Sequence, residues 1–260
     1  MVMDYQAALR LARDPPLEVL AGVLTVIITV HLLVERHLFR RDPVPRRDTP
    51  FLAGVNRVNA LAYSIFSAIS FFYCVYSLIE LFQQSKPGFR VYKLLYCGDF
   101  RVHRLRTALI IYFWAKLWEG LLDLNLVTLR GIPIHIHFRL HHYTTPIFAW
   151  LGLATGSAHG FTFMLLNLWM HICVYAWHGG VRLPALHRFI RLFQYVQLFG
   201  GIAVCALAFV GRLSGASCTA ADGLLGWAAD TIPALLFYMY YRLFLIELRD
   251  FDAELKRKPE

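Results

Sequence analysis

The chain is poor in charged residues, and acidic residues are the scarcer of the two signs. Of its 260 residues 17% are charged, whereas 58% are hydrophobic and 15% aromatic, with a mean hydropathy of +0.50. Soluble globular domains carry about 25% charged residues, so this composition excludes an ordinary soluble domain and favours a polytopic membrane protein. Low-complexity segments and internal repeats are also lacking, and we therefore predict a single domain over residues 1–260.

The charge that is present is mainly positive. Lysine and arginine outnumber aspartate and glutamate by 26 to 17, which gives a formal net charge of +9. Nucleic-acid binding would be one explanation, but the basic residues lie between apolar runs rather than on a polar face. Membrane topology and anionic ligands explain this distribution better, so we expect no nucleic-acid partner.

Cysteine is used sparingly. Three of the five cysteines (Cys74, Cys173 and Cys205) lie inside apolar runs, where a thiol usually serves as an inert packing group. Cys97 and Cys218 lie in polar loops. If both loops face an oxidising lumen, these two form the candidate disulfide.

Seven segments are long and apolar enough for a bilayer crossing, which needs about 20 residues. The sequence therefore predicts an all-α polytopic membrane protein with seven transmembrane helices. The expected spans are Leu17–Val34, Asn59–Phe82, Thr107–Leu129, a segment from Ile134 to the sequence TGSAHG, Phe161–Trp177, Phe189–Val210 and Leu224–Leu248.

The placement of lysine and arginine favours a cytosolic C-terminus. Five arginines follow the first span, and the tail is basic, although the loop at 83–106 is basic too and argues the other way. In the tail, Lys256 and Lys258 match the spacing of a dilysine retrieval signal. We therefore predict a multi-pass protein of the endoplasmic reticulum membrane without a cleavable signal.

The histidine-rich segment IHIHFRLHHYTTPIFAW, residues 134–150, stands at the start of the fourth span. His137 and His141 are four residues apart and share one helix face, with His142 about a third of a turn further round. Ionisable side chains next to lipid are costly and usually face a cavity or a partner. A single histidine would suit a hydrogen bond to a loop carbonyl, but a cluster favours a functional site.

Further polar groups occur inside the third, fifth and sixth spans. Lys116, Glu119 and Asp123 are helical neighbours that form one polar stripe, which fits a structural ion pair and a site role equally well. Asn167 and His171 share one face of the fifth span. The polar positions of the fifth and sixth spans together are Asn167, His171, Tyr175, His178, Gln194 and Gln197.

Taken in order, five motifs resemble those of the ELO family of very-long-chain fatty acid elongases, the membrane 3-ketoacyl-CoA synthases. FRLHH at 138–142 is similar to the family's HxxHH box, and NLWMHICVYAWH at 167–178 to NxxxHxxMYxYY. RLFQYVQL, KLWEGLLDL and LFYMYY resemble TxxQxxQF, KxxExxDT and LFxxFY. The resemblance implies seven transmembrane helices around a central acyl tunnel.

Four departures from these motifs mark a divergent member. Phe138 stands where the first histidine of the box belongs, with His137 one residue earlier. One extra residue separates Glu119 from Asp123. Leu124 replaces the motif's threonine, and Val174 replaces its methionine.

The resemblance implies condensation of a long-chain fatty acyl-CoA with malonyl-CoA to 3-ketoacyl-CoA, CoA and CO2. A neutral imidazole in a dry cavity can attack a thioester, and His141 is the candidate nucleophile. His142, His171 and Asn167 are the candidate oxyanion donors. The supporting or tunnel-lining candidates are His137, Lys116, Glu119, Asp123, Tyr175, His178, Gln194 and Gln197.

The expected ligands and partners follow from the same chemistry. CoA phosphates suit arginines at a cytosolic mouth, for which the candidates are Arg130, Arg139, Arg182 and Arg188. These arginines also suit the positive-inside rule alone. We expect no metal and no cofactor, and as partners acyl-CoA, malonyl-CoA, the lipid bilayer, a second copy of the chain and other elongation-cycle enzymes.

Two rival interpretations stay open at the level of sequence. A membrane di-iron desaturase or hydroxylase also uses histidine boxes in an apolar chain, but an iron pair needs about eight clustered histidines, and here only one adjacent pair occurs. A non-catalytic seven-helix lipid-binding protein is the other. The polar groups inside three spans argue against it.

Overall fold

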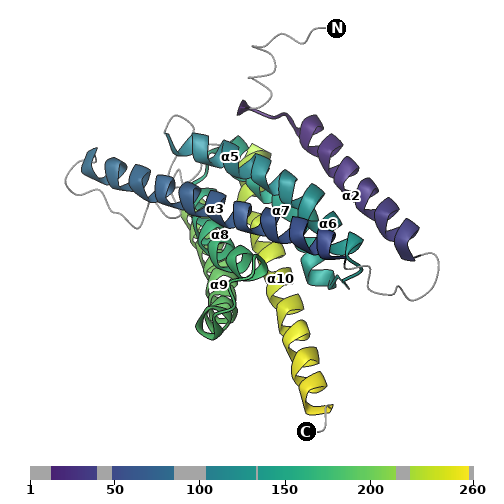
Figure 1. Cartoon of the computed structure of the whole chain (residues 1–260). Coiled ribbons are helices and arrows are strands. Elements are labelled where there is room, and N and C mark those ends of the chain that lie inside the picture. Colours follow the sequence, from purple (N-terminus) through teal and green to yellow (C-terminus); the bar gives the residue numbers. More distant parts are fainter. Residues whose placement is uncertain (1–12, 40–48, 85–103, 133, 215–222, 258–260) are drawn as a thin grey trace.

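The computed structural model describes residues 13–39, 49–84, 104–132, 134–214 and 223–257. Every element in this part of the chain is helical (Figure 1). The elements are α2 (Leu17–Phe39), α3 (Pro50–Gln84), α5 (Leu105–Trp118), the π-helical segment η1 (Glu119–Asp123), α6 (Leu124–Leu129), α7 (Ile136–Thr155), α8 (Ala158–His178), α9 (Pro184–Leu213) and α10 (Gly223–Arg257).

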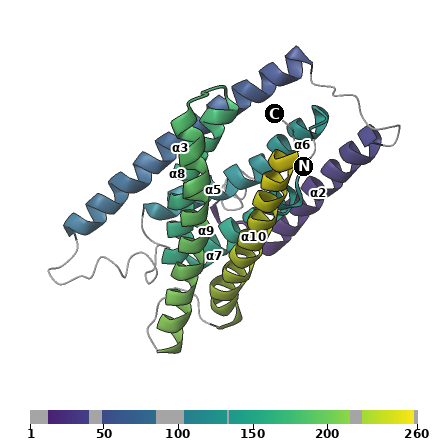
Figure 2. The ribbon, with the colours of Figure 1, turned by 90° about the horizontal axis from the view of Figure 1, so that it is seen from below.

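The helices pack as a ring with one helix outside it. Following neighbours in contact, the ring runs from α3 to α8, α9, α10, α7 and α5, and α5 contacts α3 again. Helix α2 lies against α6 and α7 on the outside, seen at one edge of the molecule in Figures 1 and 2. The C-terminal part of α10 extends beyond the other helices (Figure 1). The ring arranges six helices around one interior.

Among the described residues, four helices are long and apolar enough to cross a membrane: Leu17–Arg36, Pro50–Leu81, Ala158–His178 and Pro184–Leu213. The other expected spans contain more polar residues. Helix α5 carries Lys116, and η1, which follows it directly, begins with Glu119 and ends with Asp123. Helix α7 has histidines and an arginine in its first two turns. The chain is thus a helical membrane protein, and seven crossings stay a prediction.

The predicted spans match the helices in place, but α3 and α9 begin five or more residues earlier than predicted. Helix α3 starts at Pro50 rather than near Asn59, because the Thr49 hydroxyl accepts a hydrogen bond from Leu52 N (3.2 Å) and Pro50 occupies the first turn. Helix α9 starts at Pro184, another proline at a helix start. Such start signals are local, whereas hydropathy reports only where the apolar run begins.

The third span is not a uniform α-helix. Its centre, Glu119–Asp123, is π-helical, and these five residues include the one that is extra relative to the family motif. A π turn takes in one more residue than an α turn and often occurs at a functional site. The insertion therefore widens one turn between Glu119 and Asp123, and the helix continues as α6.

Gly120 lets this π segment approach α7. A Cβ atom built on Gly120 would lie 3.2 Å from the backbone oxygen of His142 and 3.3 Å from the Ile27 side chain. Any larger side chain must therefore push η1 away from the second histidine of the adjacent pair. The glycine therefore allows η1 to lie close to the backbone of α7 at His142.

We expect Gly120→Val to destabilise the protein by about 1–3 kcal/mol, the usual cost of overpacking a filled site. The measurement is thermal unfolding of the protein purified in detergent. Gly22→Val is the matched control, because nothing lies within 4 Å of a Cβ built on Gly22. Equal unfolding temperatures for the two variants would contradict the tight contact between η1 and α7.

The cysteines inside the described helices agree with a packing role. Cys74 and Cys205 are fully buried, Cys173 is half-buried, and all three are free thiols. Cys97 and Cys218, the predicted disulfide pair, lie outside the described residues.

Candidate active site

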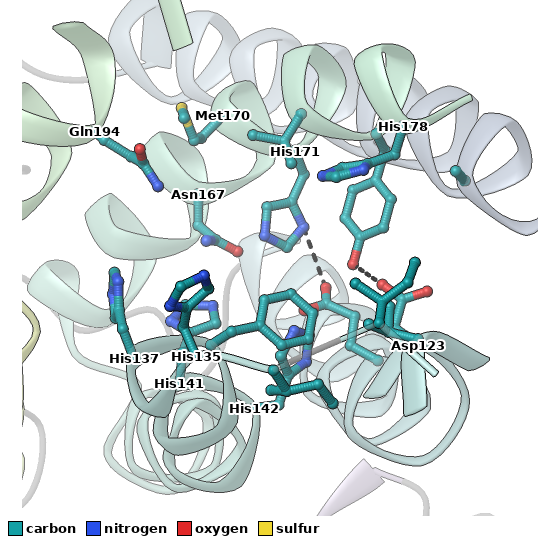
Figure 3. A pocket seen from close by; sticks show the side chains of 18 of the residues that line it. Asp123, His135, His137, His141, His142, Asn167, Met170, His171, His178 and Gln194 are labelled. Carbon is teal, nitrogen blue, oxygen red and sulfur yellow. Dashed lines mark hydrogen bonds and ion pairs between the residues drawn. The ribbon is translucent and has the colours of Figure 1, made fainter. Parts of the chain in front are cut away.

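A cavity of about 360 Å³ lies inside the helix ring. Its lining includes side chains of α3, η1, α6, α7, α8 and α9. Figure 3 shows histidines of α7 on one side and the polar face of α8 on the other. The predicted site residues that line it are Glu119, Asp123, Arg130, His137, His141, His142, Asn167, His171, Tyr175, His178, Gln194 and Gln197.

Three chemically active side chains meet at one point of this cavity. A ring nitrogen of His141, a ring nitrogen of His171 and a carboxylate oxygen of Glu119 all lie within 4.8 Å of one another. They come from α7, α8 and η1. The arrangement thus joins two histidines that are 30 positions apart in the sequence with the acidic residue of a third helix.

Glu119 is the acceptor in a buried ion pair. Lys116 Nζ donates to Glu119 Oε1 at 2.8 Å and to Oε2 at 2.9 Å, and both side chains are at most 1% exposed. The Tyr63 hydroxyl donates to Glu119 Oε1 as well. A buried charge of this kind persists only when it is paired and hydrogen-bonded. Lys116 itself does not line the cavity. It neutralises the charge of Glu119 from the side away from the cavity.

His171 lies against this ion pair. Its Nδ1 is 3.1 Å from Glu119 Oε1, marked in Figure 3, and its Nε2 is 3.3 Å from Lys116 Nζ. With the proton on Nδ1, Nε2 accepts from Lys116, and Nδ1 faces the carboxylate at ion-pair distance without forming a hydrogen bond of good geometry. The Lys116–Glu119 pair thus lies beside both nitrogens of the His171 ring.

His141 has different surroundings. Its ring contacts the rings of His137, His142 and Tyr240, with centroid distances of 6.5, 5.5 and 5.4 Å. Within the described part of the chain its ring nitrogens have no hydrogen-bond partner, although one of them is close to Glu119 and His171. His141 thus borders the cavity without a hydrogen bond to the described residues, so it can react with a molecule there.

Phe138 stands at the position of the first box histidine, and the neighbouring His137 does not take over its place. The Phe138 ring packs on His142, with centroids 4.2 Å apart. His137 lies on the other side, near Tyr240 and Phe244 of α10. His142 is 3% exposed, and its Nδ1 has no partner among the described residues. The phenylalanine therefore positions His142 by packing rather than by a hydrogen bond.

Asp123 is held by the predicted Tyr175 and by Asn59, and Asn167 is held by Tyr112; the sequence patterns did not single out Asn59 or Tyr112. The Tyr175 hydroxyl donates to Asp123 Oδ2, and Asn59 Nδ2 donates to Oδ1 at 2.5 Å. The Tyr112 hydroxyl donates to Asn167 Oδ1 at 2.9 Å, so the amide nitrogen of Asn167 is left to donate into the cavity.

Asn59, Tyr63 and Tyr112 could not be assigned from the sequence, because nothing in their sequence context distinguishes them from other polar or aromatic residues of an apolar helix. The one signal was the spacing of Asn59 and Tyr63, four residues apart on one face of α3. That face contacts α8, which carries His171 and Tyr175.

The four candidate CoA-binding arginines are placed differently from one another. Only Arg130 lines the cavity. Arg139 pairs with Glu35 of α2 at 2.5 Å, and the Arg182 guanidinium lies 4.6 Å from the centre of the Trp177 ring. Arg188 is exposed and outside the cavity lining.

The group of Glu119, His141 and His171 also has the residue types of a metal site. The surroundings of Glu119 do not fit a metal ion, because Lys116 donates to both carboxylate oxygens and places a positive charge beside them. The group also supplies far fewer ligands than a di-iron centre requires. The donor set of the described residues thus disfavours the di-iron rival.

Comparison with known proteins gives one finding that decides the family. A family model described as ELO, the GNS1/SUR4 family, matches residues 16–249. The chain belongs to the ELO family. No match was found among curated proteins or among solved structures. The matched range contains every residue of the site described above, so the resemblance of the five motifs is confirmed, and membership supports a role in fatty acid elongation in a membrane.

Proposed function

We propose that this ELO-family protein is an elongase that condenses a fatty acyl-CoA with malonyl-CoA to form 3-ketoacyl-CoA, CoA and CO2. The single observation that carries the proposal is the meeting of His141, His171 and Glu119 within 4.8 Å at one cavity. A nucleophile next to a group oriented by a third residue is the arrangement that covalent catalysis needs.

In the first half-reaction, a ring nitrogen of His141 attacks the thioester carbonyl of the acyl-CoA. The carbon–sulfur bond breaks, an acyl-imidazole forms, and the CoA thiolate leaves with the proton that the imidazole gives up. His141 suits this role because its ring has no hydrogen-bond partner in the described chain and borders the cavity.

In the second half-reaction, malonyl-CoA loses CO2, and the resulting enolate carbon attacks the acyl carbon on His141. A carbon–carbon bond forms, the carbon–nitrogen bond breaks, and the leaving imidazole takes up one proton from the solvent. The products are 3-ketoacyl-CoA and free His141.

Negative charge develops on the carbonyl oxygen in both steps and requires donors. The amide nitrogen of Asn167 suits this role because Tyr112 occupies the amide oxygen. His142 Nδ1, buried without a partner in the described chain, is the second donor. His171 acts beside them with its orientation set by the Lys116–Glu119 pair. No metal or cofactor enters this scheme.

The remaining parts of the proposal concern placement. The cavity end near Arg130 and His178 faces the cytosol and receives both CoA molecules, with Arg130 contacting a CoA phosphate. The seven helices cross the endoplasmic reticulum membrane, and the helices of the ring, without α2, surround the acyl chain. The other enzymes of the elongation cycle would act on the 3-ketoacyl product.

The test is an assay of the purified protein with radiolabelled malonyl-CoA and a panel of acyl-CoA substrates. We expect label in 3-ketoacyl products, and a loss of at least about 100-fold for His171→Ala, since charge-stabilising groups contribute effects of that size. His187→Ala is the control, because His187 stacks on Trp177 outside the cavity lining. Absence of labelled product with every acyl-CoA, in a folded wild-type protein, would reject the proposal.

A further inference from the structure

Helix α3 contacts both carboxylates of the π-helical segment η1. The Tyr63 hydroxyl donates to Glu119 Oε1, and Asn59 Nδ2 donates to Asp123 Oδ1 at 2.5 Å. Asn59 and Tyr63 are four residues apart in the sequence and therefore share one face of α3. The carboxylates at the two ends of η1 both meet that face, so two hydrogen bonds run side by side from α3 to η1.

Tyr63 belongs to the surroundings of the site and not to its surface. It is 7% exposed and does not line the cavity, whereas Glu119 and His171 do. Tyr63 therefore has no contact with a molecule in the cavity. Any effect that it has on a reaction there must pass through a residue that does line the cavity.

The ion pair of Lys116 and Glu119 does not by itself place the carboxylate against His171. The two residues are i,i+3 neighbours on one continuous helical stretch, α5 followed by η1, so they move together. Lys116 also reaches His171 Nε2 at 3.3 Å, but through a flexible four-carbon chain. Helix α8, which carries His171, packs far more extensively against α3 than against α5. The distance between the carboxylate and the His171 ring therefore depends on α3.

Tyr63 is the residue of α3 that joins the two sides. Its ring lies against α8, with centroid distances of 4.6 Å to Tyr175 and 5.8 Å to His171. The next residue, Ser64, donates to the carbonyl oxygen of Ile172 at 2.9 Å and holds α3 to α8 beside His171. A tyrosine side chain is rigid, because it has only two χ angles. The ring of Tyr63 is thus fixed on α8, and its hydroxyl is fixed on η1.

Glu119 Oε1 is the atom at which these contacts meet. It accepts from Lys116 at 2.8 Å and from Tyr63, and His171 Nδ1 lies 3.1 Å away. A carboxylate oxygen offers about two lone-pair sites, and the lysine and the tyrosine occupy both. This explains why Nδ1 lies so near without a hydrogen bond of good geometry. Loss of the tyrosine hydroxyl would free one of these sites and let the carboxylate turn toward Nδ1.

We propose that Tyr63 is a positioning residue of the condensation reaction and that it sets the Glu119 carboxylate against the His171 ring. The inference rests on the proposed function and adds to it helix α3, from which the reaction scheme uses no residue. Because Tyr63 does not border the cavity, its effect is on kcat and not on the binding of the acyl-CoA.

The experiment measures kcat and KM with an acyl-CoA that the wild type elongates. Tyr63→Phe removes only the hydroxyl and is expected to lower kcat by about tenfold or more, since a hydrogen bond to a charged group and the geometry that it maintains contribute effects of that size. Its KM should stay within about twofold of the wild-type value.

Ser64→Ala is the matched control. It removes a hydroxyl from the next residue of the same helix, at a similar burial of 9% exposed against 7%, and it breaks a contact to α8 without touching Glu119. Its kcat should stay within about twofold of the wild-type value. Rates are expressed per folded molecule in the monodisperse fraction from size-exclusion chromatography, so partial misfolding does not imitate a loss of kcat.

A double-mutant cycle tests whether Tyr63 acts through Glu119. In Lys116→Met/Glu119→Leu the ion pair is replaced by apolar side chains, a change that buried ion pairs often tolerate. Adding Tyr63→Phe to this variant should change kcat by less than about twofold, because the carboxylate that the hydroxyl positions is already gone.

Three results would overturn the inference: a wild-type kcat for Tyr63→Phe, an equal loss of kcat with and without the ion pair, or an equal loss for Ser64→Ala. A rise in KM with unchanged kcat counts as the first of these. All of them leave the proposed condensation standing, whereas absence of product from the folded wild type with every acyl-CoA rejects the function itself.

Discussion

Replacement of His141 by alanine is expected to abolish condensation, with a loss of at least about a thousandfold in kcat, because removal of a covalent nucleophile removes the step that it carries out. The measurement is formation of labelled 3-ketoacyl-CoA by the protein purified in detergent. The effect should appear in kcat, since the cavity that binds the acyl group stays in place.

His137→Ala is the control for this substitution. His137 lies one turn before His141 on the same helix and packs near it, with ring centroids 6.5 Å apart, so its removal disturbs the same helix face without removing the nucleophile. We expect its activity to fall far less. If His141→Ala turns over at a rate near that of His137→Ala, another residue attacks the thioester.

Replacement of Lys116 by methionine is expected to destabilise the protein by about 3–5 kcal/mol, because it leaves the Glu119 carboxylate buried without its positive partner. The double variant Lys116→Met/Glu119→Gln removes both charges and should recover most of that stability. Thermal unfolding of the single and double variants in detergent, combined as a double-mutant cycle, measures the coupling.

The double variant separates folding from catalysis. Its activity should stay low even though its stability returns, because the His171 ring has lost both the lysine and the carboxylate that face its nitrogens. Glu80→Gln is a suitable control, since the pair of Glu80 and Arg104 is at the surface, where such pairs contribute about 0–1 kcal/mol. A double variant as unstable as Lys116→Met alone would contradict the assignment of an ion pair.

Lys116 and Glu119 show why some parts of this site could be predicted from the sequence and others could not. Helical spacing placed Lys116 and Glu119 on one stripe, and the family motifs placed His141, His171 and Asn167 in one protein interior. Hydropathy located the helices, because burial in lipid or in a helix core requires long apolar segments. Their convergence could not be derived, since it depends on how α7, α8 and η1 pack.

The parts that could not be predicted are single polar or aromatic residues inside apolar helices. Tyr63 and Tyr112 look like ordinary core residues until their hydroxyls are found on Glu119 and Asn167. The arginines illustrate the opposite case. Arg139 belongs to the histidine box in sequence, yet it pairs with Glu35 of α2 and does not line the cavity, because neighbouring positions on a helix point in different directions.

The packing of aromatic side chains beyond His141 is the feature that could least be predicted without the three-dimensional structure. Phe148, Phe163 and Phe237 come from three helices, and none of them has a distinctive sequence context. Only their packing around Gly201 closes the interior beyond His141.

The central claim is that the acyl group is carried on His141 during the reaction. The most direct test mixes the protein with a long-chain acyl-CoA in the absence of malonyl-CoA, stops the reaction and maps the modified peptide by mass spectrometry. The account predicts an acyl group on His141 that disappears when malonyl-CoA is added before the reaction is stopped. A stable adduct on another residue, or full condensation activity with His141 unmodified throughout, would contradict it.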